Sequence, residues 1–400
     1  MSFEEMWAAL LPVGRDEATG GYHRFAWTPP ELECRSWFLD EARRRDLDVE
    51  HDANGNMFAW WFPRNGTRHN AVLTGSHLDS VPGGGAFDGP LGIVSAFAAI
   101  DRLRQRGVQP ERPIGVAALA EEEGARFGVA CLGSRLLSGA IDPARARALT
   151  DGDGHTFAEV MHNAGLDPEA IGQDDDLLGR IGCYIELHVE QGRALDRPVG
   201  IAGSIVPHGR WRFGFTGEGN HAGTTALADR RDPMPPFAGM VLAAREAAER
   251  NGTVATVGKV EVVPGGVNAI ASSVTAWLDA RGPAEDAVRR TVQEVDEAAR
   301  VAARPHRVSV DLAEESYTEI VEFNLALRDR VGAALGGGVP VLPTGAGHDA
   351  GVLSARLPAA MLFVRNPTGV SHAPAEFAEP ADCLAGVEAL TEVLDDLARG

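Results

Sequence analysis

The chain has 400 residues, about two to three times the usual domain length, so more than one domain is expected. Its 37 Lys and Arg residues against 57 Asp and Glu residues give a formal net charge of −20. A chain this acidic is repelled by phosphate backbones and anionic lipids, which disfavours nucleic-acid and membrane partners. The hydrophobic content of 44% is sufficient for buried cores and too high for intrinsic disorder.

The cysteines and the N-terminus point to a protein of the cytoplasm. The four cysteines are scattered, without a CxxC pair: Cys34, Cys131, Cys183 and Cys383. This pattern excludes a thiol-only zinc site and offers no disulfide framework. The first residues have neither a basic segment nor a sustained apolar one, so no signal peptide is predicted. The apolar stretch 91–100 is short and broken by Gly92 and Ser95, so we expect no membrane span.

The N-terminal part alternates between helix and strand patterns. In chain order we expect a helix at 31–45, strands at 56–62 and 70–75, a Pro/Gly-rich loop at 81–90, a helix at 91–106 and a strand at 114–119. Strands that alternate with helices predict a mostly parallel sheet with helices on both faces.

The pattern changes after residue 206. We expect a strand at 211–216, a helix at 237–250, strands at 253–263 and 274–279, a helix at 284–303 and a strand at 307–312. This β-α-β-β-α-β order is typical of a ferredoxin-like α+β domain. From about 323 the α/β pattern resumes, with a strand at 360–364 and a helix at 381–397. We therefore predict an α/β domain of 1–206 plus 319–400, interrupted by an inserted α+β domain at 207–318.

Histidines and carboxylates follow the predicted buried strands. His77 comes just after the strand 70–75, with Asp79 two residues later and Asp88 in a glycine-rich loop. Ligands in open α/β sheets lie at the carboxyl ends of strands, and Asp79 could fix the tautomer of a metal-binding His77. Taken alone, Asp88 is better explained as a cap of the helix at 91–106 than as a metal ligand.

Three further groups follow other strands. Glu121, Glu122 and Glu123 follow the strand 114–119, where adjacent buried carboxylates require a positive charge nearby, although a solvated acidic turn is the alternative. His188 ends an apolar stretch beside Glu186 and Glu190, and a loop after the strand 360–364 contains His372. Three histidines and two carboxylates are the ligands expected of a two-metal hydrolase centre, with a remaining carboxylate as general base.

Several motifs together resemble the M20-type amidohydrolases of the hydantoinase/carbamoylase group. They occur in order from about residue 20 to 385: GSHLDSVPGGGAFDGPLG, EEEGARFG, ELHVEQG, GEGNHAGTT, PGGVNAI, LDAR, GAGHDA and GVSHAPAE. The group includes N-carbamoyl-L-amino acid hydrolases, allantoate amidohydrolases and β-ureidopropionases. The motifs are specific for this group and do not separate its members.

The resemblance implies a centre of two divalent metal ions, for which Zn, Mn, Co and Ni are all suitable. Asp88 would bridge the ions, His77 and His188 would complete one site, and Glu123 and His372 the other. Glu122 would be the general base, since the working glutamates of the family directly precede the glycine of EEEG, and the role of Glu121 stays open. Because His188 replaces an acidic ligand, the resemblance favours the carbamoylases over M20 peptidases.

The resemblance also makes the inserted domain a lid and dimerisation domain, and thus predicts a homodimer. His221 would stabilise the oxyanion, in its own chain or across the dimer, and lid closure would bring it to the metals together with Arg281. Asn268 and Arg281 would hold a substrate carboxylate, and Gln191 would also contact the substrate. From the residues alone, Arg281 would be interpreted as a surface arginine after a strand and Asn268 as a turn residue. We give His348 a loop-shaping role.

The expected activity is hydrolysis of the ureido group of a small N-carbamoyl-L-amino acid or allantoate, with release of ammonia and, for a carbamoyl amino acid, carbon dioxide. One alternative is an M20 metallopeptidase that cleaves small peptides with the same metals. A second is a catalytically inactive binding protein on the same fold. The complete set of five ligands and a base argues against the second alternative.

Overall fold

The structure is a computed structural model that describes residues 2–399. The chain forms two compact units. The first unit runs to Ser204 and resumes at Glu322, and the second unit is Ile205–Val321. Each unit has its own sheet, helices and buried core, and each is described separately below.

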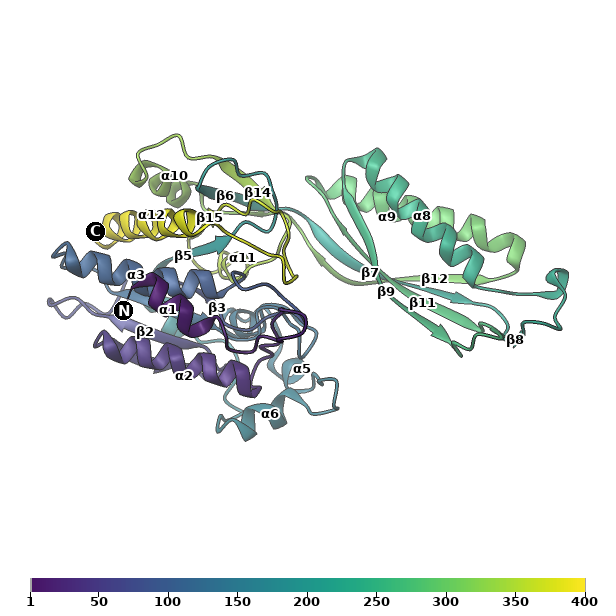
Figure 1. The fold of residues 1–400 in the computed structure, drawn as a ribbon, viewed down its shortest axis with the longest axis horizontal. Coiled ribbons are helices and arrows are strands. Elements are labelled where there is room, and N and C mark those ends of the chain that lie inside the picture. Colours follow the sequence, from purple (N-terminus) through teal and green to yellow (C-terminus); the bar gives the residue numbers. More distant parts are fainter. Residues whose placement is uncertain (1, 400) are drawn as a thin grey trace. The chain divides into compact units, whose positions relative to one another are not determined.

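A nine-stranded sheet forms the centre of the first unit (Figure 1). Its strands are β1 (Asp48–His51), β2 (Met57–Trp61), β3 (Ala71–His77), β4 (Ile114–Leu119), β5 (Ile181–Val189), β6 (Val199–Ile205), β13 (Val321–Glu322), β14 (Val341–Thr344) and β15 (Ala359–Val364). They follow the order β1-β2-β4-β3-β5-β15-β6-β13, and β14 also pairs with β6. The neighbours β4, β3, β5 and β15 are parallel, whereas β1, β2 and β6 pair antiparallel. The predicted α/β class with a mostly parallel central sheet is confirmed.

Helices cover both faces of this sheet. They are α1 (Phe3–Leu10), α2 (Pro29–Arg44), α3 (Pro90–Gln105), α4 (Leu132–Ser138), α5 (Pro143–Arg147), α6 (Phe157–Asn163), α7 (Asp175–Arg180), α10 (Leu325–Ala334), α11 (Asp349–Leu353) and α12 (Pro380–Ala398). Successive side chains of a strand point to opposite faces. In β5, Ile185 and Leu187 join the core with α3 and α12, whereas the Glu186 carboxylate accepts a hydrogen bond from the backbone N–H of Ala350 in α11.

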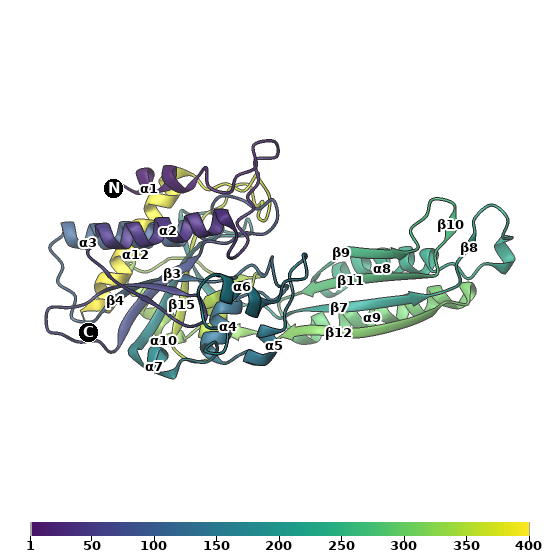
Figure 2. The ribbon, with the colours of Figure 1, turned by 90° about the horizontal axis from the view of Figure 1, so that it is seen from below.

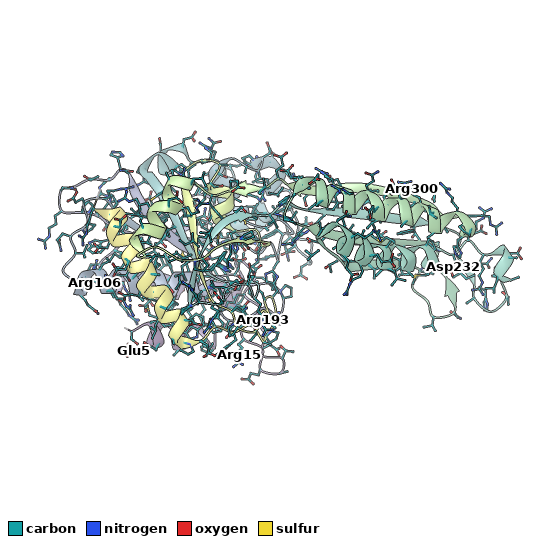
Figure 3. The ribbon with its side chains drawn as sticks, turned by 90° about the horizontal axis from the view of Figure 1, so that it is seen from above. Glu5, Arg15, Arg106, Arg193, Asp232 and Arg300 are labelled. Carbon is teal, nitrogen blue, oxygen red and sulfur yellow. The ribbon has the colours of Figure 1, made fainter. Side chains whose placement is uncertain are left out.

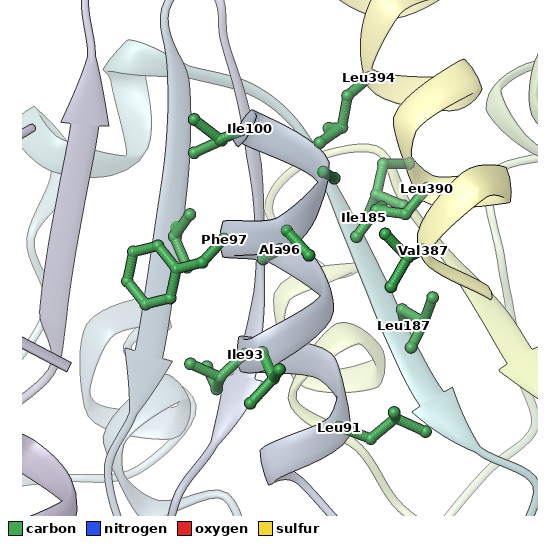
Figure 4. Close-up of a cluster of buried hydrophobic side chains, with 14 of the residues drawn as sticks. Leu91, Ile93, Ala96, Phe97, Ile100, Ile185, Leu187, Val387, Leu390 and Leu394 are labelled. Carbon is green, nitrogen blue, oxygen red and sulfur yellow. The ribbon is translucent and has the colours of Figure 1, made fainter. Parts of the chain in front are cut away.

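The largest core lies between the sheet, α3 and α12. Leu91, Ile93 and Phe97 of α3 are fully buried. Phe97 lies on one side of α3, and Val387 and Leu390 of α12 lie on the other (Figure 4). A helix covered on several sides is apolar around most of its circumference, which is why α3 is poor in charged residues until its last turns. This packing holds the N-terminus of α3, and the loop that precedes it, beside the carboxyl ends of the strands.

The second unit has a four-stranded antiparallel sheet with the order β12-β7-β11-β9 (Figure 2). Its elements are β7 (His208–Thr216), β8 (Asn220–His221), α8 (Met234–Asn251), β9 (Val254–Val263), β10 (Ala269–Ile270), β11 (Ser273–Arg281), α9 (Glu285–Ala303) and β12 (Ser309–Thr318), with 3-10 turns at Leu227–Asp229 and Arg304–His306. The helices α8 and α9 pack on one face of this sheet, and β8 pairs with β10 at one end of it. The chain order of the main elements is β-α-β-β-α-β.

One predicted strand differs clearly from the observed one. The strand expected at 307–312 is β12, Ser309–Thr318, and it extends six residues further. β12 is an edge strand paired only with β7, and its register shifts between Glu314 and Ser316. The exposed polar residues of its second half and this irregularity hide the alternation on which the prediction depended.

Surface charges are extensively paired within each unit. Arg106 forms an ion pair with Glu392 at 2.7 Å, and Arg300 forms one with Asp296 at 2.9 Å; both arginines are labelled in Figure 3. Among residues 2–399, no helix is long and apolar enough to cross a membrane.

Candidate metal centre

Four parallel strands bring the predicted ligands to one edge of the sheet. His77 is the last residue of β3, and His188 is the penultimate residue of β5. Glu122 and Glu123 lie in the turn after β4, and His372 lies in the loop after β15. Because β4, β3, β5 and β15 are adjacent and parallel, their carboxyl ends meet at the same edge.

Asp88 lies between two groups of side chains at this edge. Its Oδ1 atom is 3.3 Å from Nε2 of His77 and 3.1 Å from Nε2 of His188. Its Oδ2 atom is 3.4 Å from Nε2 of His372, which is also 3.5 Å from Oε2 of Glu123. The two oxygens of one carboxylate therefore face two different sets of nitrogen and oxygen donors, as a bridging ligand requires.

The donor set fits two divalent metal ions. The ligand atoms of His77, Asp88 and His188 lie within 4.8 Å of one another, and so do those of Asp88, Glu123 and His372. Nε2 of His77 and Nε2 of His188 are buried, and neither atom has a hydrogen-bond partner among residues 2–399. Buried polar atoms normally have a partner, and imidazole with carboxylate suits Zn, Mn, Co or Ni.

The electrostatics of the cluster also call for added positive charge. Burial and the negative charge of Asp88 raise the pKa of the Glu123 carboxyl well above its ordinary value. Burial likewise raises the pKa of the Glu122 carboxyl well above its ordinary value. Burial alone would also raise the pKa of Asp88, but the adjacent His188 and His77 hold it well below its ordinary value. Bound cations would keep all three carboxylates ionised.

The loop that contains Asp88 leads directly into α3. This helix begins at Pro90, preceded by Gly89, and has no side-chain hydrogen bond at its N-cap. The alternative prediction that Asp88 merely caps the helix is therefore wrong. Gly89 has a φ of 84°, and a Cβ atom there would lie 2.5 Å from the imidazole of His77. Glycine is needed at this position so that the loop can approach His77.

The turn after β4 is not a solvated acidic turn. Glu121 is 1% exposed and Glu122 is 6% exposed, which contradicts that alternative. The Glu121 carboxylate accepts hydrogen bonds from the backbone N–H groups of Arg126 (2.9 Å) and Phe127 (2.7 Å). Glu121, whose role the sequence left open, thus closes the turn that presents Glu122 and Glu123.

Asp79 contacts both sides of the cluster. Its backbone carbonyl oxygen is 3.1 Å from Nδ1 of His77, whereas its carboxylate is 3.6 Å from the same atom. The carboxylate instead accepts hydrogen bonds from the backbone N–H groups of Glu122 (3.2 Å) and Glu123 (3.0 Å). The nearest acceptor for the imidazole is therefore a carbonyl, not the carboxylate expected from the sequence.

Glu122 lies between His77 and a cysteine. Its Oε2 atom is 3.7 Å from Nε2 of His77, and its Oε1 atom accepts a hydrogen bond from Sγ of Cys131 at 3.5 Å. Cys131 is buried and precedes α4, and its backbone N–H donates to the Glu122 carbonyl at 2.6 Å. Sequence reasoning gave Cys131 no role.

Two polar side chains contact the carboxylate of Asp88. Nε2 of Gln191 donates to Oδ2 of Asp88 at 2.7 Å and lies 3.2 Å from Nε2 of His372. Oγ of Ser371 lies 3.3 Å from the same oxygen and 3.2 Å from the carboxylate of Glu376, and its one hydrogen is donated to one of these acceptors at a time. Gln191 was predicted to contact substrate, whereas Ser371 and Glu376 were missed. Both lie in the motif GVSHAPAE: Ser371 directly precedes His372, and Glu376 follows it by four residues. Their nearness to a predicted ligand was the sequence signal that could have identified them.

His348 lies behind the centre. It is 2% exposed, and its ring is 4.6 Å from that of His188, with an interplanar angle of 61°. Burial lowers the pKa of His348 well below its ordinary value, so the ring is neutral. The next residue, Asp349, accepts a hydrogen bond from Oγ of Ser134 at 2.5 Å and begins α11. His348 thus packs against a predicted metal ligand as well as shaping its loop.

The remaining predicted site residues all lie in the second unit. His221 in β8 and Asn268 before β10 are exposed, and the backbone N–H of Ala222 donates to the Asn268 carbonyl at 2.9 Å. Arg281 ends β11 and binds both carboxylate oxygens of Asp279, at 2.7 and 3.0 Å. His221 and Asn268 are adjacent to one another, and Arg281 is not beside them.

Residues 73–396 match the protein family described as "Peptidase family M20/M25/M40". The chain belongs to this family. Among curated members, it is 36% identical to an N-carbamoyl-L-amino acid amidohydrolase of Geobacillus stearothermophilus, over 99% of both chains. It is 32% identical to an allantoate amidohydrolase of Escherichia coli, over 99% of this chain and 98% of the other. A ureidoglycolate hydrolase of Arabidopsis thaliana is 31% identical over 94% of this chain and 82% of its own.

Solved structures of the family agree with these relatives. An amidase of the hydantoinase/carbamoylase family from Burkholderia vietnamiensis matches all of this chain and 98% of its own, with a TM-score of 0.90 and 28% identity. An aminopeptidase PepT from Bacillus cereus reaches a TM-score of 0.64 at 14% identity, which shows a shared fold alone. The family and its named relatives identify the chain as a hydrolase and favour an amidohydrolase over the peptidase alternative.

Proposed function

We propose that the protein hydrolyses the ureido group of an N-carbamoyl-L-amino acid or allantoate with the help of two divalent metal ions. The observation that carries this proposal is the position of Asp88, whose two oxygens face two separate sets of donors. The names of the amidohydrolase relatives support the ureido class of substrate. The buried free cysteines are in keeping with a reducing, cytoplasmic location.

His77, His188 and Asp88 would hold one ion, and Asp88, Glu123 and His372 the other. When bound, the ions would polarise the weakly electrophilic ureido carbonyl and lower the pKa of a water molecule towards neutrality. Glu122 accepts the proton of the attacking water and returns it to the leaving nitrogen. Glu122 suits this role because it lies beside the ligands without belonging to either of the two donor sets.

Asp79 positions the base and one ligand together. Its carboxylate fixes the backbone of Glu122 and Glu123, and its carbonyl oxygen accepts from Nδ1 of His77. A hydrogen bond at Nδ1 leaves Nε2 of His77 unprotonated and able to bind a metal. The proposed base, Glu122, therefore lies in a turn after β4 whose backbone is fixed by Asp79, which follows the neighbouring strand β3.

Arg281 is proposed to bind the carboxylate of the substrate. Its Nε and Nη2 atoms donate to the carboxylate of Asp279, which fixes the plane of the guanidinium that would bind the substrate. We expect Arg281→Ala to lower kcat/KM for N-carbamoyl amino acids by about 10–100-fold, mainly through KM, because a hydrogen bond to a charged group contributes about 1.5–3 kcal/mol. Steady-state kinetics with carboxylate-bearing substrates measures this loss.

Two controls separate this role from damage to the sheet. Arg210→Ala removes another arginine near Asp279, 3.7 Å away, and should leave KM unchanged. A ureide without a carboxylate should be hydrolysed equally by the parent protein and by Arg281→Ala. An equal loss for both kinds of substrate would refute the carboxylate-binding role.

The second unit supports a homodimer in which His221 and Asn268 act on the active site of the partner chain. His221 in β8 and Asn268 before β10 lie beyond the end of β11 that begins at Ser273. Arg281 is the last residue at the opposite end of β11. The eight residue steps from Ser273 to Arg281 span roughly 26 Å at about 3.3 Å per residue. A small ureido acid cannot contact both ends of one strand at once, which favours a site in which His221 and Arg281 come from different chains.

The edge strand β9 and the helix α8 offer a surface for this dimer. β9 pairs with β11 on one side only, and Val254, Val260 and Val263 are 63%, 47% and 54% exposed. Leu242 on α8 is 68% exposed. Exposed edge strands with apolar residues pair readily with another chain.

Mixing two inactive variants tests the shared site. We expect His221→Ala and Glu122→Gln each to be inactive, and their heterodimer to contain one complete site. A random mixture of subunits should then recover about a quarter of the parent activity, because about half of the dimers carry one working site of two. Ammonia release before and after subunit exchange measures this. No recovery in a mixture shown to contain heterodimers would contradict a site shared between chains.

The substrate is tested with a panel of ureido compounds. Ammonia release is measured from several N-carbamoyl-L-amino acids, their D-isomers, allantoate and β-ureidopropionate, with Mn and Zn supplied separately. Turnover of one class by the metal-loaded protein is the expected result, and it identifies the substrate. Cleavage of dipeptides without turnover of any ureido compound would overturn the proposed function in favour of a peptidase.

A further inference from the structure

The two halves of the candidate metal centre are built differently. His77 and His188 belong to central strands and are fully buried. The side chain of His372 is 49% exposed, lies in a loop, and its backbone has a φ of 56°. The first half is therefore positioned by the sheet itself, whereas the second half depends on how the loop of His372 is attached to the loop of Asp88.

Glu376 joins these two loops. Its Oε1 atom accepts hydrogen bonds from the backbone N–H groups of Phe87 (2.9 Å) and Asp88 (3.0 Å). Its Oε2 atom accepts from Oγ of Ser371, the residue before His372, and the same hydroxyl lies 3.3 Å from Oδ2 of Asp88. Glu376 is 5% exposed, so these hydrogen bonds are shielded from water and persist in a low dielectric.

In the loop that contains Asp88, Gly85 leaves the space that the side chain of Glu376 occupies. A Cβ atom at Gly85 would collide with the Cβ, Cδ and Oε1 atoms of Glu376. At Gly84, the nearest atom to an added Cβ would be Cγ2 of Val81, at 3.1 Å, and no atom of Glu376 is among its three nearest neighbours. The side chain of Glu376 therefore occupies a space that only glycine at position 85 provides.

We propose that Glu376 is a positioning residue that sets the separation between Asp88 and His372, and thereby the affinity of the ion held by Asp88, Glu123 and His372. The ion held by His77, Asp88 and His188 should depend on it less, because two of its three ligands, His77 and His188, are fixed in β3 and β5. This inference rests on the proposed two-metal centre. It predicts a selective loss of one of two ions when the link between the loops is removed.

The experiment is a calorimetric titration of the chelator-treated full chain with Mn²⁺, without substrate. The parent protein should bind two ions. Glu376→Ala should bind the second ion about 10–100-fold more weakly, the usual effect of removing a residue that orients a metal ligand, and should weaken the first ion much less. His372→Ala should show the same single strong site, and the double variant should be no worse than His372→Ala.

Three variants exclude a general structural effect. Glu376→Gln keeps an Oε1 atom that can accept from Phe87 and Asp88, so it should retain most of the affinity for the second ion. Gly85→Ala displaces Glu376 without changing its chemistry and should behave like Glu376→Ala. Gly84→Ala, in the same loop, should behave like the parent. Circular dichroism checks that each variant is folded.

The outcomes distinguish two failures. If Glu376→Ala and Gly85→Ala bind both ions as the parent does, or weaken both ions equally, the positioning role is wrong while the two-metal centre stands. If the parent itself binds fewer than two ions, the two-metal centre is wrong and the role of Glu376 falls with it.

Discussion

Replacing Glu122 with glutamine is expected to lower kcat by about 10²–10⁴-fold, the usual contribution of a positioned general base. A carboxamide at this position occupies the same space but cannot accept a proton from water. Glu122 contacts His77 and Cys131 and lies outside both donor sets, so metal content and thermal unfolding should not change. Ammonia release, metal analysis and circular dichroism measure the three quantities.

The neighbouring glutamate provides a matched control. Glu121 is equally buried, but its Oε1 atom only accepts hydrogen bonds from the backbone at Arg126 and Phe127. Glutamine can make the same bonds through its own Oε1, so Glu121→Gln should have little effect on kcat. Substantial turnover by Glu122→Gln, or an equal loss in both variants, would refute the assignment of Glu122 as the base.

Asp88→Asn is expected to abolish activity and to release both metal ions. Each carboxylate oxygen of Asp88 faces a different donor set, and a carboxamide has only one oxygen and one NH₂ group to present. A residue that only orients a ligand changes metal affinity by about 10–100-fold, so removal of a shared ligand should weaken both ions by at least that factor. Metal content after dialysis against a metal-free buffer measures the loss.

Asp52→Asn is the control for this variant. Asp52 is another buried carboxylate, which accepts hydrogen bonds from the backbone N–H groups of Asn54 (3.0 Å) and Asn56 (2.8 Å), and it belongs to none of the candidate metal groups among residues 2–399. Asp52→Asn should keep its full metal content. Retention of both ions by Asp88→Asn would show that Asp88 does not bridge them.

Much of the fold is predictable because its central strands are short, apolar and followed by polar residues. β4 lies at the predicted residues, and β3, β15, α3 and α12 lie within two residues of them. The antiparallel flanks were not predicted, since strand direction is a property of pairing and not of periodicity. The second half of β12 was missed because an exposed edge strand has no apolar alternation to detect.

The candidate site was predictable to the extent that each ligand is marked by a strand end or a motif. His77, Asp88, Glu123, His188 and His372 were all named, and they are adjacent in the structure. The contacts that position them could not be read from the sequence. The carboxylate of Glu376 binds the backbone of Asp88, 288 residues away in the chain, so the order of residues gives no sign of this contact. The carbonyl of Asp79 and the thiol of Cys131 are near their partners in sequence, and their contacts depend on the local backbone of the two turns.

The separation of Arg281 from His221 could not be inferred from the motifs either. Both were assigned to one substrate, and their spacing depends on the length of β11 and on the pairing of β8 with β10 beyond its end. Only the register of the antiparallel sheet places them at opposite ends of one strand.

Metal-dependent release of ammonia from an N-carbamoyl-L-amino acid is the most direct test of the proposed chemistry. The protein is stripped with a chelator, reconstituted with Mn²⁺ or Zn²⁺, and assayed for ammonia and free amino acid. We predict that the reconstituted protein releases the two products in equal amounts and that the stripped protein releases neither. Equal rates with and without metal, or no ammonia from any ureido acid by a protein shown to carry its metals, would contradict this account.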